Sequence, residues 1–119
     1  MNRFIFTGYV ADNPALVYNN TIINFTLEIQ KKNRKGEYII DDFRCAVYGE
    51  NVKRFMDKKI QIGDMIAGEG EMRSKTYTDL DGIEKRQVYV NVSYIERIKH
   101  ARDVELPGRS YTGYDRDRD

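Results

Sequence analysis

From Ile22 to Gln30 the chain places an apolar residue at every second position, and polar residues fill the positions between them. The apolar set is Ile23, Phe25, Leu27 and Ile29. Successive side chains of a β-strand point to opposite faces of a sheet, so this period of two predicts a strand with one buried and one exposed face. Such a strand needs a sheet that buries its apolar face, and this requirement favours an all-β fold.

Four further segments have the composition of strands, namely residues 2–10, 39–48, 65–72 and 87–98. In the second of these we expect Phe43, Cys45 and Val47 to face inward. The alternate residues, Arg44, Ala46 and Tyr48, are then expected to face outward. Residues 73–88 are expected to form a charged hairpin with its turn at Asp81-Gly82.

Residues 50–59 change period, because Val52, Phe55 and Met56 recur at the spacing of an amphipathic helix. Five strands with one short helix between the third and the fourth is the element order of an OB-fold barrel. An open five-stranded sheet with a packed helix has the same order and stays an alternative. We expect one domain over residues 1–102 and a disordered C-terminal tail over residues 103–119, where few apolar groups are available for burial.

The charge is distributed unevenly, although the whole chain carries only +1. Residues 1–102 hold 17 Lys and Arg against 14 Asp and Glu, whereas residues 103–119 hold 3 Arg against 5 acids. The predicted domain is therefore mildly basic, which is compatible with a polyanionic partner. The single cysteine, Cys45, rules out an intramolecular disulfide framework, so we expect a reducing compartment, the cytoplasm. We expect no membrane association.

An ordered series of segments carries a resemblance to a known family. The segments are Met1–Gly8, Asp12–Pro14, Asn24–Leu27, Phe43–Gly49, Glu50–Val52 and Arg73–Asp79 with Gly82 nearby. Taken together they resemble the bacterial and phage single-stranded DNA-binding proteins over roughly residues 1–100. The resemblance implies an OB-fold, a homotetramer, and a role in coating exposed DNA strands during replication, recombination and repair, with replication or recombination proteins as further partners.

The chain departs from the family pattern at three places. Asn33 stands in the loop where the family commonly has an aromatic residue, and Asp42 replaces a large aromatic at the start of the third strand. The acidic tail of bacterial members ends in an apolar tip, whereas this sequence ends in alternating Asp and Arg. The two missing aromatic residues bear on the affinity for DNA more than on the function. The tail and the divergent strands favour a phage or plasmid member, which would act in the host cytoplasm.

Binding of single strands requires aromatic side chains that stack on bases and cations that follow the phosphates. We expect Tyr48 and Tyr77 to stack, Tyr77 because the family carries Trp or Tyr at the matching position. Capping of the core, with the hydroxyl in water, is the alternative for either tyrosine. The candidate cations lie in the strands and in two loops, and they are Arg3, Lys31, Lys32, Arg34, Arg44, Arg73, Lys75, Lys85 and Arg86. Any one of these cations could instead belong to a solvated face.

Enzymatic interpretations are weaker. A metal-dependent nuclease on the same barrel would use Asp41, Asp42, Glu69 and Glu71 as ligands, but Asp41 and Asp42 point to opposite faces. The only histidine, His100, has no partner that the sequence suggests, and Cys45 falls on the inward face as a core thiol. We therefore expect no catalytic activity, no metal and no cofactor. An RNA-binding or protein-interaction OB module stays open as an alternative.

Overall fold

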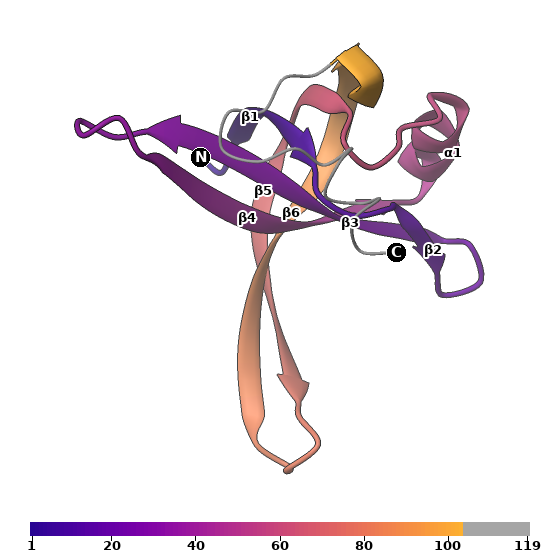
Figure 1. Ribbon diagram of the computed structural model, residues 1–119. Coiled ribbons are helices and arrows are strands. Elements are labelled where there is room, and N and C mark those ends of the chain that lie inside the picture. The colour runs from indigo at the N-terminus through magenta and orange to yellow at the C-terminus, as the bar shows by residue number, and fades with distance from the viewer. Residues whose placement is uncertain (104–119) are drawn as a thin grey trace.

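The computed structural model describes residues 1–103, which form mainly β-strands with one short α-helix (Figure 1). The strands are β1 (Phe4–Val10), β2 (Ala15–Val17), β3 (Ile22–Lys32), β4 (Tyr38–Tyr48), β5 (Met65–Thr78) and β6 (Glu84–Lys99). The helix α1 (Glu50–Asp57) lies between β4 and β5, and a 3-10 turn (Ala101–Asp103) follows β6. No helix in the described part of the chain has the length and apolar character that a membrane crossing needs.

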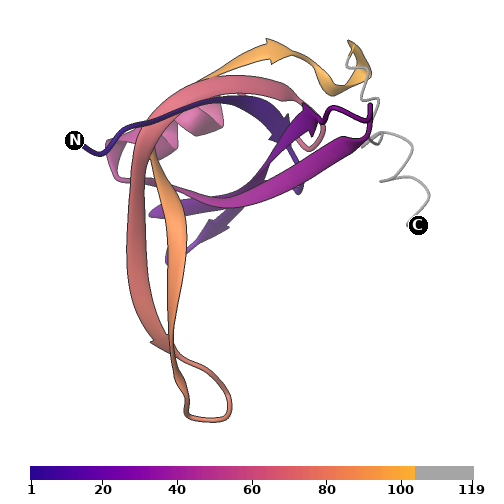
Figure 2. The same ribbon diagram turned by 90° about the vertical axis from the view of Figure 1, so that its left-hand side faces the viewer.

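Five of the strands close into a barrel, which Figure 2 shows nearly end-on. The sheet order is β1-β5-β6-β4-β3, and a second pairing of β1 with β3 joins the two ends. This closing contact aligns Tyr9 with Glu28 and Val10 with Leu27. Neighbouring strands run antiparallel except for β4 and β6, which are parallel at Cys45 and Ala46. The prediction of an OB-fold is confirmed, and the open-sheet alternative is excluded by the closure.

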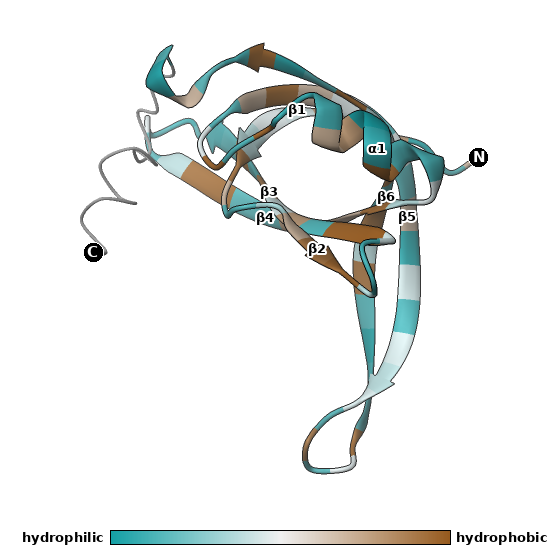
Figure 3. Cartoon of the chain, turned by 90° about the vertical axis from the view of Figure 1, so that its right-hand side faces the viewer, coloured by the Kyte–Doolittle hydropathy of each residue, from teal (hydrophilic) through white to brown (hydrophobic). Residues whose placement is uncertain are grey.

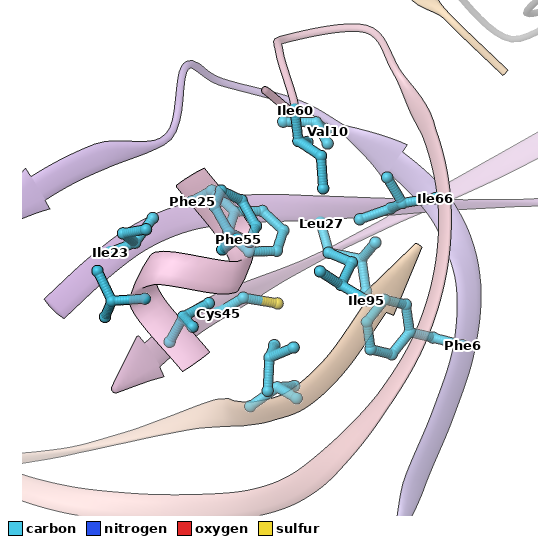
Figure 4. Close-up of a cluster of buried hydrophobic side chains, with 14 residues drawn as sticks. Phe6, Val10, Ile23, Phe25, Leu27, Cys45, Phe55, Ile60, Ile66 and Ile95 are labelled. Atoms are coloured by element: carbon cyan, nitrogen blue, oxygen red, sulfur yellow. The ribbon is translucent and has the colours of Figure 1, made fainter. Parts of the chain in front are cut away.

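The barrel interior holds the apolar faces that the alternation predicts (Figure 4). Phe25 of β3 stacks on Phe55 of α1, with their ring centroids 5.5 Å apart. The helix thereby covers one end of the barrel with Val52 and Phe55, whereas Met56, which was expected to share that face, is 48% exposed. Cys45 is a buried core thiol, as expected.

β5 and β6 are too long for the barrel, with 14 and 16 residues. The N-terminal part of β5 and the C-terminal part of β6 belong to the barrel wall. The rest of both strands extends away from the barrel as a two-stranded arm (Figures 1 and 2). We use "arm" for residues 73–89, where Figure 3 shows mostly hydrophilic colours. The charged hairpin expected over residues 73–88 is thus a continuation of β5 and β6, which both extend further than the sequence suggested.

The bend between barrel and arm coincides with two glycines that approach β6 closely. A register shift falls between Glu69 and Gly70, where β6 contributes an extra residue. A Cβ at Gly68 would collide with the carbonyl oxygen of Tyr94, and one at Gly70 with that of Asn91. Residues without a Cβ allow this approach, and a bulge bends the strand pair and increases its twist.

Some details differ from the sequence-based expectation. β2 was not predicted, because three residues are too few to show an alternation. Ala46 was expected to be exposed but is buried, since the base of the arm covers it. Glu28, in the outward set of β3, is also buried. Asp103 belongs to the 3-10 turn, and the rest of the predicted tail, residues 104–119, lies outside the described residues.

Replacing Gly70 by Ala tests whether the close approach sets the bend. The added methyl group must displace the backbone of Asn91, so we expect Gly70→Ala to lower the free energy of unfolding by about 1–3 kcal/mol in urea denaturation. Thr76→Ala, on the exposed part of the same strand, should change it by less than about 0.5 kcal/mol. Equal stability of the two variants would contradict this account of the bend.

Candidate nucleic-acid interface

The two faces of the arm differ in chemistry. The strand register pairs Arg73 with Tyr89, Lys75 with Gln87 and Tyr77 with Lys85. Because directly paired residues of an antiparallel ribbon share a face, these six side chains lie together. We call this surface the basic face of the arm. The opposite face carries Ser74, Thr76, Thr78, Glu84, Arg86 and Val88.

The basic face of the arm meets the barrel at Tyr48, the last residue of β4. The ring centroids of Tyr48 and Tyr89 are 6.5 Å apart and their planes are inclined by 55°. The Lys75 ammonium lies 5.6 Å from the centroid of the Tyr89 ring, within the range of a cation–π interaction. Arm and barrel enclose a small polar hollow of about 50 Å³, which we call the corner. Its lining is Asn24, Arg44, Cys45, Ala46, Tyr48, Lys75, Gln87 and Tyr89.

The position of Tyr48 in the corner changes its acidity. Partial burial, followed by the neighbouring Tyr89 and Tyr18 phenols, raises the pKa of Tyr48 to about 12, against a smaller opposing effect of Arg73. A phenol is neutral at physiological pH even at its ordinary pKa near 10, so the raised pKa reports the enclosure of Tyr48 and not a change in its charge. A neutral aromatic ring between cations is suited to stacking on a base while the cations contact phosphates.

Arg44 is held on the outer surface of β4, two residues before Ala46. Its guanidinium donates a hydrogen bond to Thr26 Oγ1 (3.0 Å) and lies 3.7 Å from the Asp12 carboxylate. Asp12 is itself fixed, because it accepts hydrogen bonds from the backbone and the hydroxyl of Thr26. The Arg44 side chain is half exposed, so it is positioned and still accessible to a phosphate.

The far end of the same sheet surface carries the cations of the β3–β4 loop. Lys32 pairs with Tyr38 across the two strands, and its ammonium lies 6.0 Å from the Tyr38 ring. Asn33 shapes the turn by accepting hydrogen bonds from the backbone N–H groups of Lys35 and Glu37. Lys32 and Tyr38 share the outer face with Arg44 and Tyr48, because all four occupy even positions in the paired strands. Lys31 falls on the other face, and Arg34 is exposed in the loop.

Two acids lie between these groups on the outer face. Glu28 and Asp42 are paired across β3 and β4, between Lys32 and Arg44 and two residues along each strand from the Thr26–Arg44 pair. Glu28 is buried and accepts a hydrogen bond from the Gln30 amide (2.8 Å), while Asp42 is exposed. The outer face is therefore divided into a basic part near the β3–β4 loop and a second basic part that continues through the corner onto the arm.

Three predicted cations lie away from this surface. Arg3 forms an ion pair with Glu69 on the β1–β5 side of the barrel, with Nε 2.7 Å from the carboxylate. This contact holds the pKa of Glu69 below its usual range. Arg86 lies on the opposite face of the arm, where it donates a hydrogen bond to Ser74 Oγ (3.3 Å). Lys31 also falls on the other face of β3, and Arg34 is exposed in the β3–β4 loop. The remaining candidates lie on the surface described above, and they are Lys32, Arg44, Arg73, Lys75 and Lys85 together with Tyr48 and Tyr77.

Two aromatic residues of this surface were not among the sequence-based candidates. Tyr89 falls within the predicted last strand, residues 87–98, but its pairing with Arg73 depends on the register between β5 and β6, which the sequence alone does not give. The alternation with Lys85 and Gln87 could have indicated its face. Tyr38 was missed because the third strand was expected to begin one residue later. Its place opposite Lys32 depends on the register of the hairpin.

Three side chains that the enzymatic interpretations would use, those of Cys45, Glu69 and Glu71, are either buried in the core or held in ion pairs. Burial raises the pKa of the Cys45 thiol to about 12, which suits a core residue better than a nucleophile. Glu69 and Glu71 form ion pairs with Arg3 and Arg73. Within residues 1–103 no three His, Cys, Asp or Glu side chains are grouped so that they could hold a metal ion.

Comparison with known proteins agrees with this geometry. The model of the single-strand binding protein family matches residues 1–98, nearly the whole described chain. The chain belongs to the single-strand binding protein family. None of the curated proteins matches the sequence significantly. Members of this family are binding proteins and not enzymes.

Solved structures with the same fold include two single-stranded DNA-binding proteins. A single-stranded DNA-binding protein of Plasmodium falciparum in complex with single-stranded DNA superposes with a TM-score of 0.66 at 20% identity, covering 84% of this chain and 95% of the other. The small single-stranded DNA-binding protein of Streptomyces coelicolor gives a TM-score of 0.59 at 15% identity, covering 80% and 92%. At these identities the similarity shows that the fold is shared.

The pKa of Tyr48 provides a test of the corner without any ligand. In an alkaline titration followed by phenolate absorbance, the difference between wild type and Tyr48→Phe should show one group with a midpoint near pH 12. Because the folded state raises this pKa, the stability that the neutral phenol contributes is complete below about pH 10 and is lost as the pH rises to about 12. A midpoint near pH 10 would mean that Tyr48 is not enclosed by the arm.

Proposed function

We propose that this protein binds single-stranded DNA along a path that runs from the β3–β4 loop over the outer face of β3 and β4, through the corner, and onto the basic face of the arm. The observation that carries the proposal is the separation of side chains between the two faces of the arm. Arg73, Lys75 and Lys85 share one face with Tyr77 and Tyr89. Cations and aromatic rings in alternation are what a single strand requires, because each nucleotide offers a phosphate and a base.

The character of these contacts supports binding without strong sequence preference. Stacking accepts any base, since every base has a π-face, and Lys contacts a phosphate without reading the sequence. The bases of a duplex are already stacked on one another and are not available to Tyr48 or Tyr77. We therefore propose that the protein covers and protects exposed strands during replication, recombination or repair, in the host cytoplasm if the chain is a phage member.

We also propose that the protein acts as a homo-oligomer, a tetramer by analogy with the family. Ile5 is 67% exposed on the outer face of β1. The first part of β1 pairs with β5 on one side, whereas β3 pairs only with Tyr9 and Val10 on the other. A free strand edge beside an exposed apolar side chain is suited to pairing with a symmetry-related copy. Light scattering at micromolar concentration tests this assembly, and a monomer would contradict it.

The arm allows a matched test of the DNA path. Lys75→Ala removes a cation from the basic face, whereas Arg86→Ala removes one from the opposite face of the same ribbon. In titrations with poly(dT), we expect Lys75→Ala to weaken binding and to reduce the salt dependence by about 0.7 in the slope of log K against log salt concentration. Arg86→Ala should leave both unchanged. Equal effects of the two variants would show that the arm does not bind DNA through one face.

The stacking role of Tyr77 is tested in the same titrations. We expect Tyr77→Ala to lose on the order of 1–3 kcal/mol of binding free energy, because one base loses its stacking partner. Val88→Ala, on the opposite face, serves as the control. Quenching of tyrosine fluorescence on binding reports the contact directly, since the chain has no tryptophan. Competition with poly(U) distinguishes DNA from RNA, and preferential binding of RNA would overturn the proposed substrate.

A further inference from the structure

The turn between β2 and β3 has an unusual backbone conformation. Three consecutive residues, Tyr18, Asn19 and Asn20, have φ angles of 52°, 57° and 64°. Asn tolerates this left-handed region because its short side chain can form local hydrogen bonds, but a bulky aromatic residue rarely adopts it. Tyr18 is therefore the strained member of the turn.

The neighbouring residues hold Tyr18 in this conformation. The Thr21 N–H donates to the carbonyl oxygens of Val17 and Tyr18 at 3.2 Å each, and the Thr21 hydroxyl donates to the Tyr18 carbonyl at 2.6 Å. Backbone strain persists only where the surroundings enforce it, and strained residues cluster at binding sites and ligand clamps. A tyrosine at a position whose backbone conformation suits Asn or Gly points to a use for its ring.

The side chain of Tyr18 is mostly exposed to solvent. Tyr18 is 71% exposed. Among the described residues its ring takes part in none of the aromatic or cation–π pairs, in which the tyrosines are Tyr38, Tyr48, Tyr89 and Tyr94. Stabilisation of the core is therefore a poor explanation for an aromatic side chain here.

The sheet places this turn beside the corner. Val17 of β2 pairs with Ile22 of β3, which in turn pairs with Tyr48 of β4. Adjacent strands are about 4.8 Å apart, so Val17 lies roughly 10 Å from Tyr48 across the sheet. Tyr18 follows Val17 directly, and its phenol is near enough to contribute to the raised pKa of Tyr48.

We propose that Tyr18 is a further base-stacking platform, presented by a strained turn, that extends the DNA path beyond Tyr48 to the β2–β3 turn. The proposal rests on the single-strand binding proposed above and adds a site to it. Tyr18 lies beside the point where the path turns from the outer face of β3 and β4 onto the arm, and it adds one stacking position there. The strained backbone holds the ring in solvent, where a base can stack on it.

A single substitution separates stability from binding at this position. Tyr18→Asn removes the ring and introduces a residue that tolerates the left-handed region. We expect it to raise the midpoint of urea unfolding while it weakens poly(dT) binding by about tenfold. Tyr18→Phe keeps the ring and should bind within about twofold of wild type. Unchanged affinity of Tyr18→Asn, in titrations where wild type binds poly(dT) and Tyr77→Ala binds more weakly, would overturn this inference and leave the proposed function intact.

Tyr94 offers a matched control because it is also exposed, at 53%, but lies beside α1 with its ring under the Lys58 ammonium. Tyr94→Asn should leave poly(dT) affinity unchanged. Oligomer mass is measured for each variant, and a changed mass for Tyr18→Asn would assign the residue to assembly and overturn the proposal. If wild type fails to bind poly(dT), the proposed function itself is wrong.

Photocrosslinking identifies the contact independently of affinity. Oligo(dT) that carries 5-iododeoxyuridine is irradiated in complex with the wild-type protein, and the attached residues are mapped by mass spectrometry. We expect Tyr18 among them, together with Tyr48 or Tyr77. Crosslinks at the latter two without any at Tyr18 would show that the strand does not reach the turn.

Discussion

The close approach of β5 and β6 at Gly68 and Gly70 is the constraint on which the rest of the structure depends. Both strands must belong to the barrel wall at one end and to the free arm at the other. A side chain at either glycine would push the backbones of the two strands apart. The register shift at Glu69–Gly70 redirects the pair, so that the arm meets the barrel at an angle and creates the corner.

The period of two then determines what the corner contains. Along β4 it brings Arg44 and Tyr48 to the outer face, and along the arm it brings Lys75 and Tyr89 to the face that meets them. This placement partly buries the Tyr48 phenol, which raises its pKa, while the Arg44 side chain beside it stays half exposed. A chain with a net charge of only +1 can in this way present a locally basic and aromatic surface.

Much of the architecture could be predicted from local sequence. The alternation in β3 and β4 identified the face of each strand that packs in the barrel, although Glu28 and Ala46 of the opposite face are buried as well. The change to helical spacing likewise located α1. The features that could not be predicted are those that depend on the partner strand. The ion pair of Arg3 with Glu69 joins residues far apart in sequence, and the burial of Ala46 depends on the arm that covers it.

In the candidate surface, too, positions along one strand could be predicted, whereas the faces that depend on the pairing of strands could not. Tyr48 and Tyr77 were identified from their strand positions and from the resemblance, and the structure places both on one continuous surface. Lys85 and Arg86 were grouped as neighbours in sequence, although adjacent strand residues must point to opposite faces. Their separation follows from the extension of β6 to Glu84, which the charged composition of the hairpin concealed.

The arm has a thermodynamic consequence of its own. A ribbon of two strands with both faces in solvent is only marginally stable, so its folded form is in equilibrium with frayed forms. Only the folded form aligns the cations and rings of the basic face. The apparent affinity for a ligand on that face is then the intrinsic affinity reduced by the fraction of arms that are folded. The length and the composition of the ribbon thus set binding strength through a local folding equilibrium, independently of any contact to the ligand.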